Sequence, residues 1–139
     1  MWLLRRLQVR RQSLFDALRA FYRRYLGENN REGRGLRLLR DWLTPRQCED
    51  FDSNGYFEVI GCDTGRRYRV LYGTAMNVHE LDEAGRLKMG WCFVPDGSLV
   101  AGDVMLAQKI ALETFESGAL SVAKRFVPKD GSQLALTRL

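Results

Sequence analysis

The stretch that decides the fold runs from Gly55 to Val94 and has the sequence GYFEVIGCDTGRRYRVLYGTAMNVHELDEAGRLKMGWCFV. Four short runs within it are rich in apolar residues that alternate with polar ones, at 55–61, 67–73, 77–81 and 87–94. A few turn-forming residues separate the runs, with glycine available where a turn needs a positive φ. This spacing predicts an antiparallel meander of three to four strands, in which the run at 77–81 is the shortest.

Residue parity predicts which side of each strand faces the core, because successive side chains of a strand point to opposite faces. Two alternating apolar sets are expected to share the core face: Tyr68, Val70 and Tyr72, and Leu87, Met89, Trp91 and Phe93. The first strand is apolar on both sides, since Tyr56 and Ile60 alternate with Phe57 and Val59. We therefore expect the first strand to be covered on both faces.

Helical patterns precede the meander. Leu36, Leu39 and Leu43 are spaced as on one face of a short helix. Thr-Pro-Arg-Gln at 44–47 then matches a capping box, with Thr44 as N-cap and proline at the first helical position. Ser-Asn-Gly at 53–55 is expected to end this second helix, because Asn and Gly tolerate the left-handed conformation of a helix stop.

A longer helix is expected after the meander. Asp103 is predicted to cap it, and it should continue to about Glu116. Its apolar residues predict a broad buried face: Val104, Ala107, Ile110, Ala111, Leu112 and Phe115. Gly118 is predicted to interrupt the helix. Residues 120–126 are predicted to add about two more turns, with Lys124 and Arg125 at the C-terminus.

These elements predict an α+β fold, an antiparallel three- to four-stranded meander packed against a C-terminal helix and preceded by an amphipathic N-terminal helix. A chain of 139 residues suits one domain. We expect a basic helix and a glycine-rich loop over residues 1–35, the α+β domain over 36–127, and a flexible tail over 128–139.

The first 26 residues carry the strongest helical pattern of the chain. Winding them at 100° per residue gathers one apolar stripe: Leu3, Leu4, Leu7, Leu14, Leu18, Phe21, Tyr22 and Tyr25. Arginines flank the stripe on both sides, and Arg11 falls inside it. Residues 1–40 contain eleven arginines and three acidic residues, a balance of +8, whereas the whole chain carries +5. The positive charge therefore belongs to the N-terminal segment.

Four roles are open to this helix. It can pack on its own domain with arginine stems covering the edges of the contact. It can dock on an acidic protein assembly, bind nucleic-acid phosphates, or lie in an anionic membrane surface. Among the external roles we favour the protein partner, then nucleic acid, then the membrane. The predicted contact residues are Trp2, Arg5, Arg6, Arg10, Arg11, Arg19, Arg23 and Arg24.

The residues that could carry catalysis or bind a metal do not form a recognisable motif. Cys48, Cys62, His79 and Cys92 lie too far apart in sequence for a short chelating pair, and each is explained as a packing, turn or strand residue. Glu80 and Asp82 could form a carboxylate pair, but the sequence from Asp82 is typical of a hairpin turn. The sequence therefore predicts no enzyme, metal, cofactor or small-molecule substrate.

Three cysteines without a Cys-x-x-Cys pair favour a reducing compartment, and the cytoplasm is the simplest assignment. Arg5 and Arg6 are not followed by an apolar run, which argues against a secretory signal. An arginine-rich, acid-poor leader is also the composition of an organellar transit peptide.

Residues 43–126 resemble a group of small bacterial proteins of unknown function. The residues that carry the resemblance are LTPRQ at 43–47, GYFEVIG at 55–61, TGRRYRV at 64–70, residues 73–82, CFVP at 92–95 and DVMLAQKIALE at 103–113. The resemblance leaves out the basic helix and implies no activity. The sequence thus favours a non-enzymatic binding or assembly module that docks on a larger protein through its arginine-rich helix, with nucleic-acid binding by the same helix as the alternative.

Overall fold

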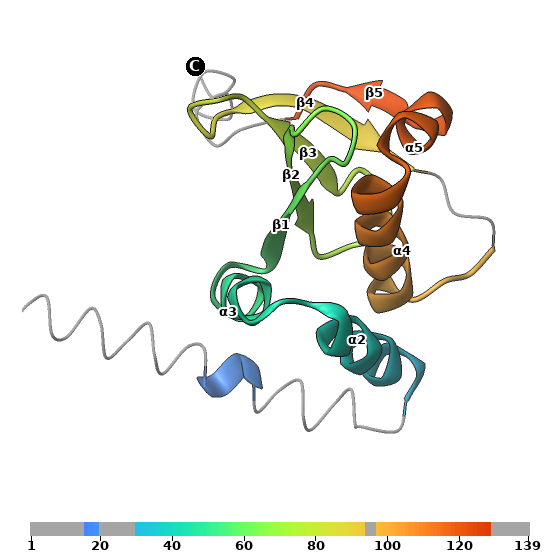
Figure 1. The fold of residues 1–139 in the computed structure, drawn as a ribbon. Helices are drawn as coiled ribbons and strands as arrows, with labels where there is room; N and C mark the ends of the chain where they lie inside the picture. Colours follow the sequence, from blue (N-terminus) through green and yellow to red (C-terminus); the bar gives the residue numbers. More distant parts are fainter. Residues whose placement is uncertain (1–15, 20–29, 94–96, 129–139) are drawn as a thin grey trace, which may run out of the picture.

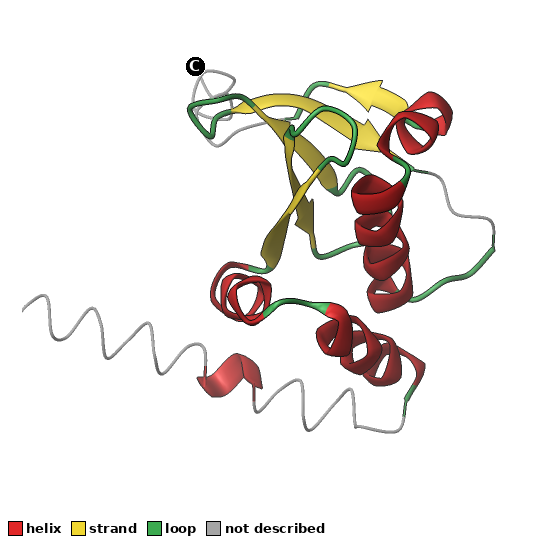
Figure 2. Cartoon of the chain, viewed as in Figure 1, coloured by secondary structure: helices red, strands yellow, loops and turns green. Residues whose placement is uncertain are grey.

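The computed structural model describes residues 16–19, 30–93 and 97–128. A short helical turn at 16–19 is followed by α2 (Arg31–Trp42) and α3 (Pro45–Asn54). The strands β1 (Tyr56–Ile60), β2 (Arg67–Leu71), β3 (Val78–Leu81) and β4 (Leu87–Cys92) follow. The chain continues through α4 (Ala101–Thr114), α5 (Glu116–Val122) and β5 (Lys124–Phe126). Helix α4 packs against the strands, which confirms the α+β class (Figures 1 and 2).

The strands form one antiparallel sheet in the order β1-β2-β3-β4-β5. The predicted four-stranded meander is confirmed, and β5 adds a fifth strand at the edge. The prediction of helical turns at 120–126 was wrong at its C-terminal end, because Lys124, Arg125 and Phe126 pair with β4. Pairing with an exposed strand edge satisfies backbone groups that a frayed last turn of helix would leave open.

The predicted core face of the sheet is confirmed at its centre. Cross-strand pairing places one set of buried side chains on the same side: Phe57, Val59, Tyr68, Val70, Val78 and Trp91. Met105 and Leu112 of α4 complete this core. Tyr72 lies outside it and donates a hydrogen bond from its hydroxyl to Glu32 at 2.7 Å. The expected double cover of β1 is also wrong, because Ile60 is 55% exposed.

Helix α2 begins earlier than predicted. The Asn30 side chain caps it by accepting from the Gly33 N–H at 2.7 Å, so residues 31–35 are helical and not part of a loop. Helix packing explains the glycine at position 35. A Cβ added to Gly102 of α4 would overlap the backbone of Gly35. Two glycines facing each other let the helix axes approach closely, and this role cannot be told from turn chemistry in the sequence.

Helix α3 matches its prediction. Thr44 accepts from the Gln47 N–H, and the Gln47 side chain accepts from the Thr44 N–H, so the capping box is complete. Gly55 ends the helix with φ +76°, the left-handed conformation expected there. The Gln47 side-chain amide also donates to the Glu58 carbonyl at 2.7 Å, which covers part of the free edge of β1.

Helix α4 differs from its prediction at both ends. It begins at Ala101, and Asp103 lies in its first turn instead of capping it. The helix stops at Phe115, where ψ is +53°, and Gly118 lies inside α5. The predicted apolar face was wrong at Ala107, Ile110 and Phe115, which are exposed. Helix α4 packs between the sheet and α2, so its buried surface is wider than one amphipathic stripe. This surface also lies on a different side of the helix from the apolar face that the sequence predicted.

Candidate functional site

The predicted partner-binding residues lie mostly outside the described part of the chain. Of the eight, the structure describes Arg19, which lies in the short helical turn 16–19. All four residues of this turn are exposed. Leu18, a member of the predicted apolar stripe, is 46% exposed. Trp2, Arg5, Arg6, Arg10, Arg11, Arg23 and Arg24 lie outside the described residues.

Part of the N-terminal positive charge lies on α2, where it makes contacts within the chain. Arg40 forms a two-pronged ion pair with Asp52 of α3, which raises the pKa of the guanidinium. Arg31 donates to the Ser98 carbonyl at 3.3 Å. Leu38 and Trp42 of the same helix remain exposed, Trp42 to 59%. Helix α2 is therefore anchored through its buried side and presents apolar surface outward.

The cysteines and the histidine lie on different elements. Cys48 is on α3, Cys62 in the β1–β2 turn, Cys92 at the end of β4, and His79 on β3. Within residues 16–19, 30–93 and 97–128, no three His, Cys, Asp or Glu side chains form a group that could hold a metal ion. The Cys62 sulfur accepts from the Glu116 N–H at 3.4 Å and so belongs to a turn contact.

The carboxylate pair considered from sequence is separated by the structure. Asp82 accepts from the N–H groups of Ala84 and Arg86, both at 2.9 Å, and these turn contacts hold its pKa below the ordinary range. Glu80 lies on β3 opposite Tyr68 and Met89, on the core face of the sheet, and is buried. The hairpin-turn interpretation of Asp82 is confirmed.

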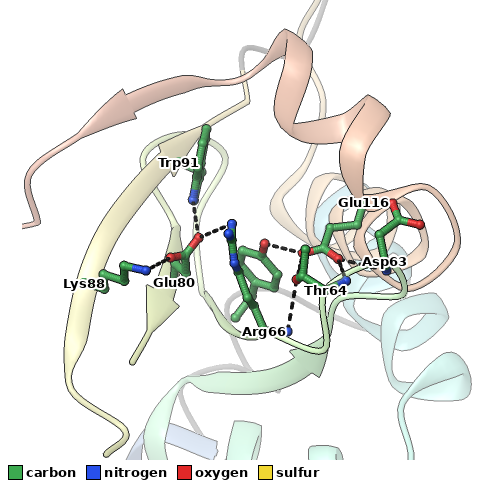
Figure 3. A network of polar contacts seen from close by, with 8 residues as sticks. Asp63, Thr64, Arg66, Glu80, Lys88, Trp91 and Glu116 are labelled. Carbon is green, nitrogen blue, oxygen red and sulfur yellow. Dashed lines mark hydrogen bonds and ion pairs between the residues drawn. The ribbon is translucent and has the colours of Figure 1, made fainter. Parts of the chain in front are cut away.

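Two buried carboxylates, Glu80 and Glu116, organise the polar contacts at one end of the sheet (Figure 3). Glu116 opens α5 and receives four hydrogen bonds at its carboxylate. Its Oε1 accepts from the N–H groups of Asp63 and Thr64 at 3.0 and 2.9 Å. Its Oε2 accepts from the Thr64 hydroxyl at 2.6 Å and the Tyr68 hydroxyl at 2.5 Å. The carboxylate thus fastens the β1–β2 turn to the break between α4 and α5.

These hydrogen bonds decide the protonation states of the cluster. Burial alone would raise the pKa of Glu116, but the bonds from Thr64, Tyr68 and the backbone outweigh it, and the pKa falls below its ordinary value. Burial and the bond to this carboxylate raise the pKa of the Tyr68 hydroxyl. At neutral pH the pair is therefore a carboxylate and a neutral phenol. Both carboxylate oxygens of Glu116 are thus engaged by donors of the same chain, from the β1–β2 turn and from Tyr68 of β2.

Glu80 forms the second half of the cluster. Arg66 and Lys88 each place a side-chain nitrogen 3.5 Å from its carboxylate, and the Trp91 indole N–H donates to it at 3.4 Å. Arg66 and Lys88 are partly exposed, so they link the buried charge to the surface. The arrangement satisfies a buried anion with two cations and one neutral donor, as burial of a charge requires.

Sequence reasoning considered Glu80 only as a partner of Asp82, and it assigned no functional role to Glu116. A glutamate on the core-facing parity of a strand was a signal for Glu80, because that position opposes Tyr68 and Met89. For Glu116 the sequence offered only an acidic residue at the presumed end of a helix. Gly61 was a further signal: a Cβ there would overlap the Glu116 carboxylate.

Comparison of the chain with protein-family models, with curated proteins and with solved structures gives no match in any of the three. A search of the described residues for a helix long and apolar enough to cross a bilayer finds none.

Proposed function

We propose that this protein is a non-enzymatic binding or assembly module of the cytoplasm, which docks on a larger protein partner through its arginine-rich N-terminal helix. The observation that carries the proposal is the exposure of Leu18. This residue belongs to the apolar stripe of the predicted helix, yet 46% of its surface is open to water. A stripe used only for packing on its own domain would bury it.

The energetics favour an outside partner. Full burial of a leucine side chain contributes about 1.5–3 kcal/mol, so a half-exposed leucine retains part of that for binding. Leucine and aromatic residues at helical spacing are the anchors by which an amphipathic helix fills an apolar groove. The flanking arginines suit an acidic rim, because a guanidinium binds a carboxylate through two parallel hydrogen bonds.

The described domain supports a non-catalytic role. Its core cluster extends from Leu39 to Leu112 and is built from the sheet, α2 and α4. The two buried carboxylates, Glu80 and Glu116, are engaged by donors of the same chain. These contacts stabilise turns and the sheet, and we assign them a structural role.

The test compares three tagged full-length proteins in native extract treated with nuclease: wild type, Leu18→Glu and Ala20→Glu. In a helix of 100° per residue, Ala20 lies about 160° from Leu18 and so on the polar side, which makes Ala20→Glu the matched control. Wild type and the control should retain a common protein that Leu18→Glu loses. All three should unfold at the same urea concentration, because residue 18 is exposed.

Two results would contradict the proposal. Retention of the same proteins by all three variants, or of none, would remove the docking role of Leu18. Retention that is seen only in a parallel extract without nuclease, and that falls steeply with salt, would favour the alternative, nucleic-acid binding by the helix.

A further inference from the structure

The outer face of the sheet carries a row of side chains that spans all five strands. Cross-strand pairing joins Glu58 of β1 to Arg69 of β2, Arg69 to His79 of β3, His79 to Gly90 of β4, and Gly90 to Phe126 of β5. Strands in a sheet lie about 4.8 Å apart, so the row is about 19 Å long. Helix α4 packs against β1 and β2 from the opposite, core face. Figure 1 shows α4 and α5 together on that side.

One end of the row is a flat aromatic surface. A Cβ added to Gly90 would overlap the Phe126 ring, so this ring lies directly on the backbone of β4. The His79 imidazole meets the same ring edge-on, with 5.9 Å between centroids. Burial, together with the charge of Arg69, lowers the pKa of His79, so the imidazole is neutral at pH 7. The Phe126 side chain covers Gly90 and is itself only partly buried.

Next to the other end of the row lies a cation, Arg69 of β2, that is only loosely paired with a carboxylate. Arg69 covers the Tyr56 ring, with its guanidinium carbon 4.2 Å from the centroid. The neighbouring carboxylate of Glu58 is taken mainly by Arg67, at 2.9–3.1 Å, and its contact with Arg69 is 3.9 Å long. The Arg69 Nε is buried and has no hydrogen-bond partner among the described residues. Two arginines thus share one carboxylate, and this leaves net positive charge beside the aromatic surface.

From this row we infer that the outer sheet face binds single-stranded nucleic acid, with a base stacked on Phe126 beside His79 and the backbone phosphate held by Arg69. Aromatic faces interleaved with cations are what unpaired bases and their phosphates require. Antiparallel sheets with aromatic side chains on an open face bind RNA by stacking two or three bases. A duplex offers no unstacked base to the ring, so single strands are preferred.

The occupant follows from the charge and the shape of the face. A peptide strand would pair with the backbone at the free edge of β1 or β5, whereas the row consists of residues on the face of the sheet. An acidic protein surface could meet the arginine but gains nothing from stacking on a flat ring. The proposed contacts come from residues of the sheet and not from those predicted for the N-terminal helix, so the inference goes beyond the docking role proposed above and does not depend on it.

The test measures fluorescence anisotropy of labelled 12-nucleotide RNAs, one of uridines and one of adenosines, with the full-length protein. Phe126→Leu keeps an apolar cover on Gly90 but removes the π face, and it should weaken binding by between about 5-fold and 150-fold. Phe126→Trp keeps a stacking face and should stay near wild type. Circular dichroism melting of both variants separates a binding defect from unfolding.

The charge is tested through the dependence of affinity on salt. Arg69→Ala should lower the slope of log affinity against log salt by about 0.7, the value for one phosphate on a single strand. Arg46→Ala on α3 removes the same charge from another part of the surface and should leave affinity and slope unchanged.

Four results would overturn the inference. One is wild-type affinity in both Phe126→Leu and Arg69→Ala. Another is tighter binding to a 12-base-pair duplex than to either RNA. The third is absence of binding to both RNAs at low salt. Loss of RNA binding only when Arg5, Arg6, Arg10 and Arg11 are replaced together would assign nucleic acid to the helix and equally overturn the sheet site.

Discussion

Replacement of Glu116 by glutamine tests most directly how much the hydrogen bonds of its carboxylate stabilise the fold. The two N–H groups of the β1–β2 turn both donate to Oε1, so a glutamine amide oxygen in that place keeps them. The NH₂ group must then take the place of Oε2, where it meets the hydroxyls of Thr64 and Tyr68. Both hydroxyls donate to the carboxylate in the wild type and would have to turn around.

The magnitude follows from the charge of the acceptor. A hydrogen bond to a charged group contributes about 1.5–3 kcal/mol and a neutral one about 0.5–1.5 kcal/mol, a difference of about 1 kcal/mol for each bond. Four bonds then lose about 4 kcal/mol in total. Because the neutral amide is less costly to bury than a carboxylate, part of this loss is offset. We expect Glu116→Gln to lower the free energy of unfolding by about 2 kcal/mol at pH 7.

The assay is urea unfolding followed by tryptophan fluorescence, with Glu49→Gln on the exposed side of α3 as control, expected to stay within about 0.5 kcal/mol of wild type. Since the folded pKa of Glu116 is lowered from 4.5, its carboxylate stabilises the fold fully above pH 4.5. That stability is lost as the pH falls through the folded pKa. The gap between wild type and Glu116→Gln should therefore close on acidification. Equal stability at pH 7, or a gap that stays constant in acid, would refute the reasoning.

Three further predictions concern packing and titration. Gly102→Ala should destabilise the protein by about 3 kcal/mol in urea unfolding, because its Cβ would overlap the rigid backbone at Gly35; wild-type stability would contradict the close approach. The side-chain amides of Asn77 and Gln108 donate to each other through hydrogen bonds of 2.8 and 2.9 Å. A double-mutant cycle with alanine at both positions should therefore give a coupling energy of about 1 kcal/mol. Additive effects of the two substitutions would contradict this interaction. The pKa of His79, measured by NMR, should lie below 6.5, because burial and the Arg69 guanidinium lower it. The free energy of unfolding should therefore decrease as the pH falls just below 6.5. A pKa at or above 6.5 would contradict this prediction.

The sequence was a good guide where a local pattern sets the structure. Alternation placed Tyr68, Val70 and Trp91 on the core face correctly, because one side of a strand can be buried only by residues of one parity. The capping box at Thr44 was equally readable, since its partners lie within four residues of each other.

The sequence was a poor guide where contacts between residues far apart in the chain determine the structure. Gly35 was expected in a loop, and what explains a glycine at this helical position is the close approach of Gly102, 67 residues away. Strand β5 is three residues long and forms by pairing with β4, so its own sequence contains no period to detect. The carboxylate of Glu116 is buried because a turn 52 residues earlier donates to it. None of these partners is specified by local propensity.

The same difference between local patterns and distant contacts applies to the candidate sites. The apolar stripe with its flanking arginines could be predicted from residue spacing alone, and Leu18 and Arg19 are exposed in the described turn. The row across the outer sheet face could not be drawn, because it requires the register of five strands. Arg69 and His79 are separate polar residues in the sequence and become neighbours only through pairing.

The docking role is tested most directly by placing a photo-crosslinking amino acid at position 18 of the full-length protein and irradiating living cells. The account predicts a covalent product between this chain and a different, larger protein, and no such product from the same group at position 20. A crosslink from position 18 that joins only residues of its own chain would contradict it.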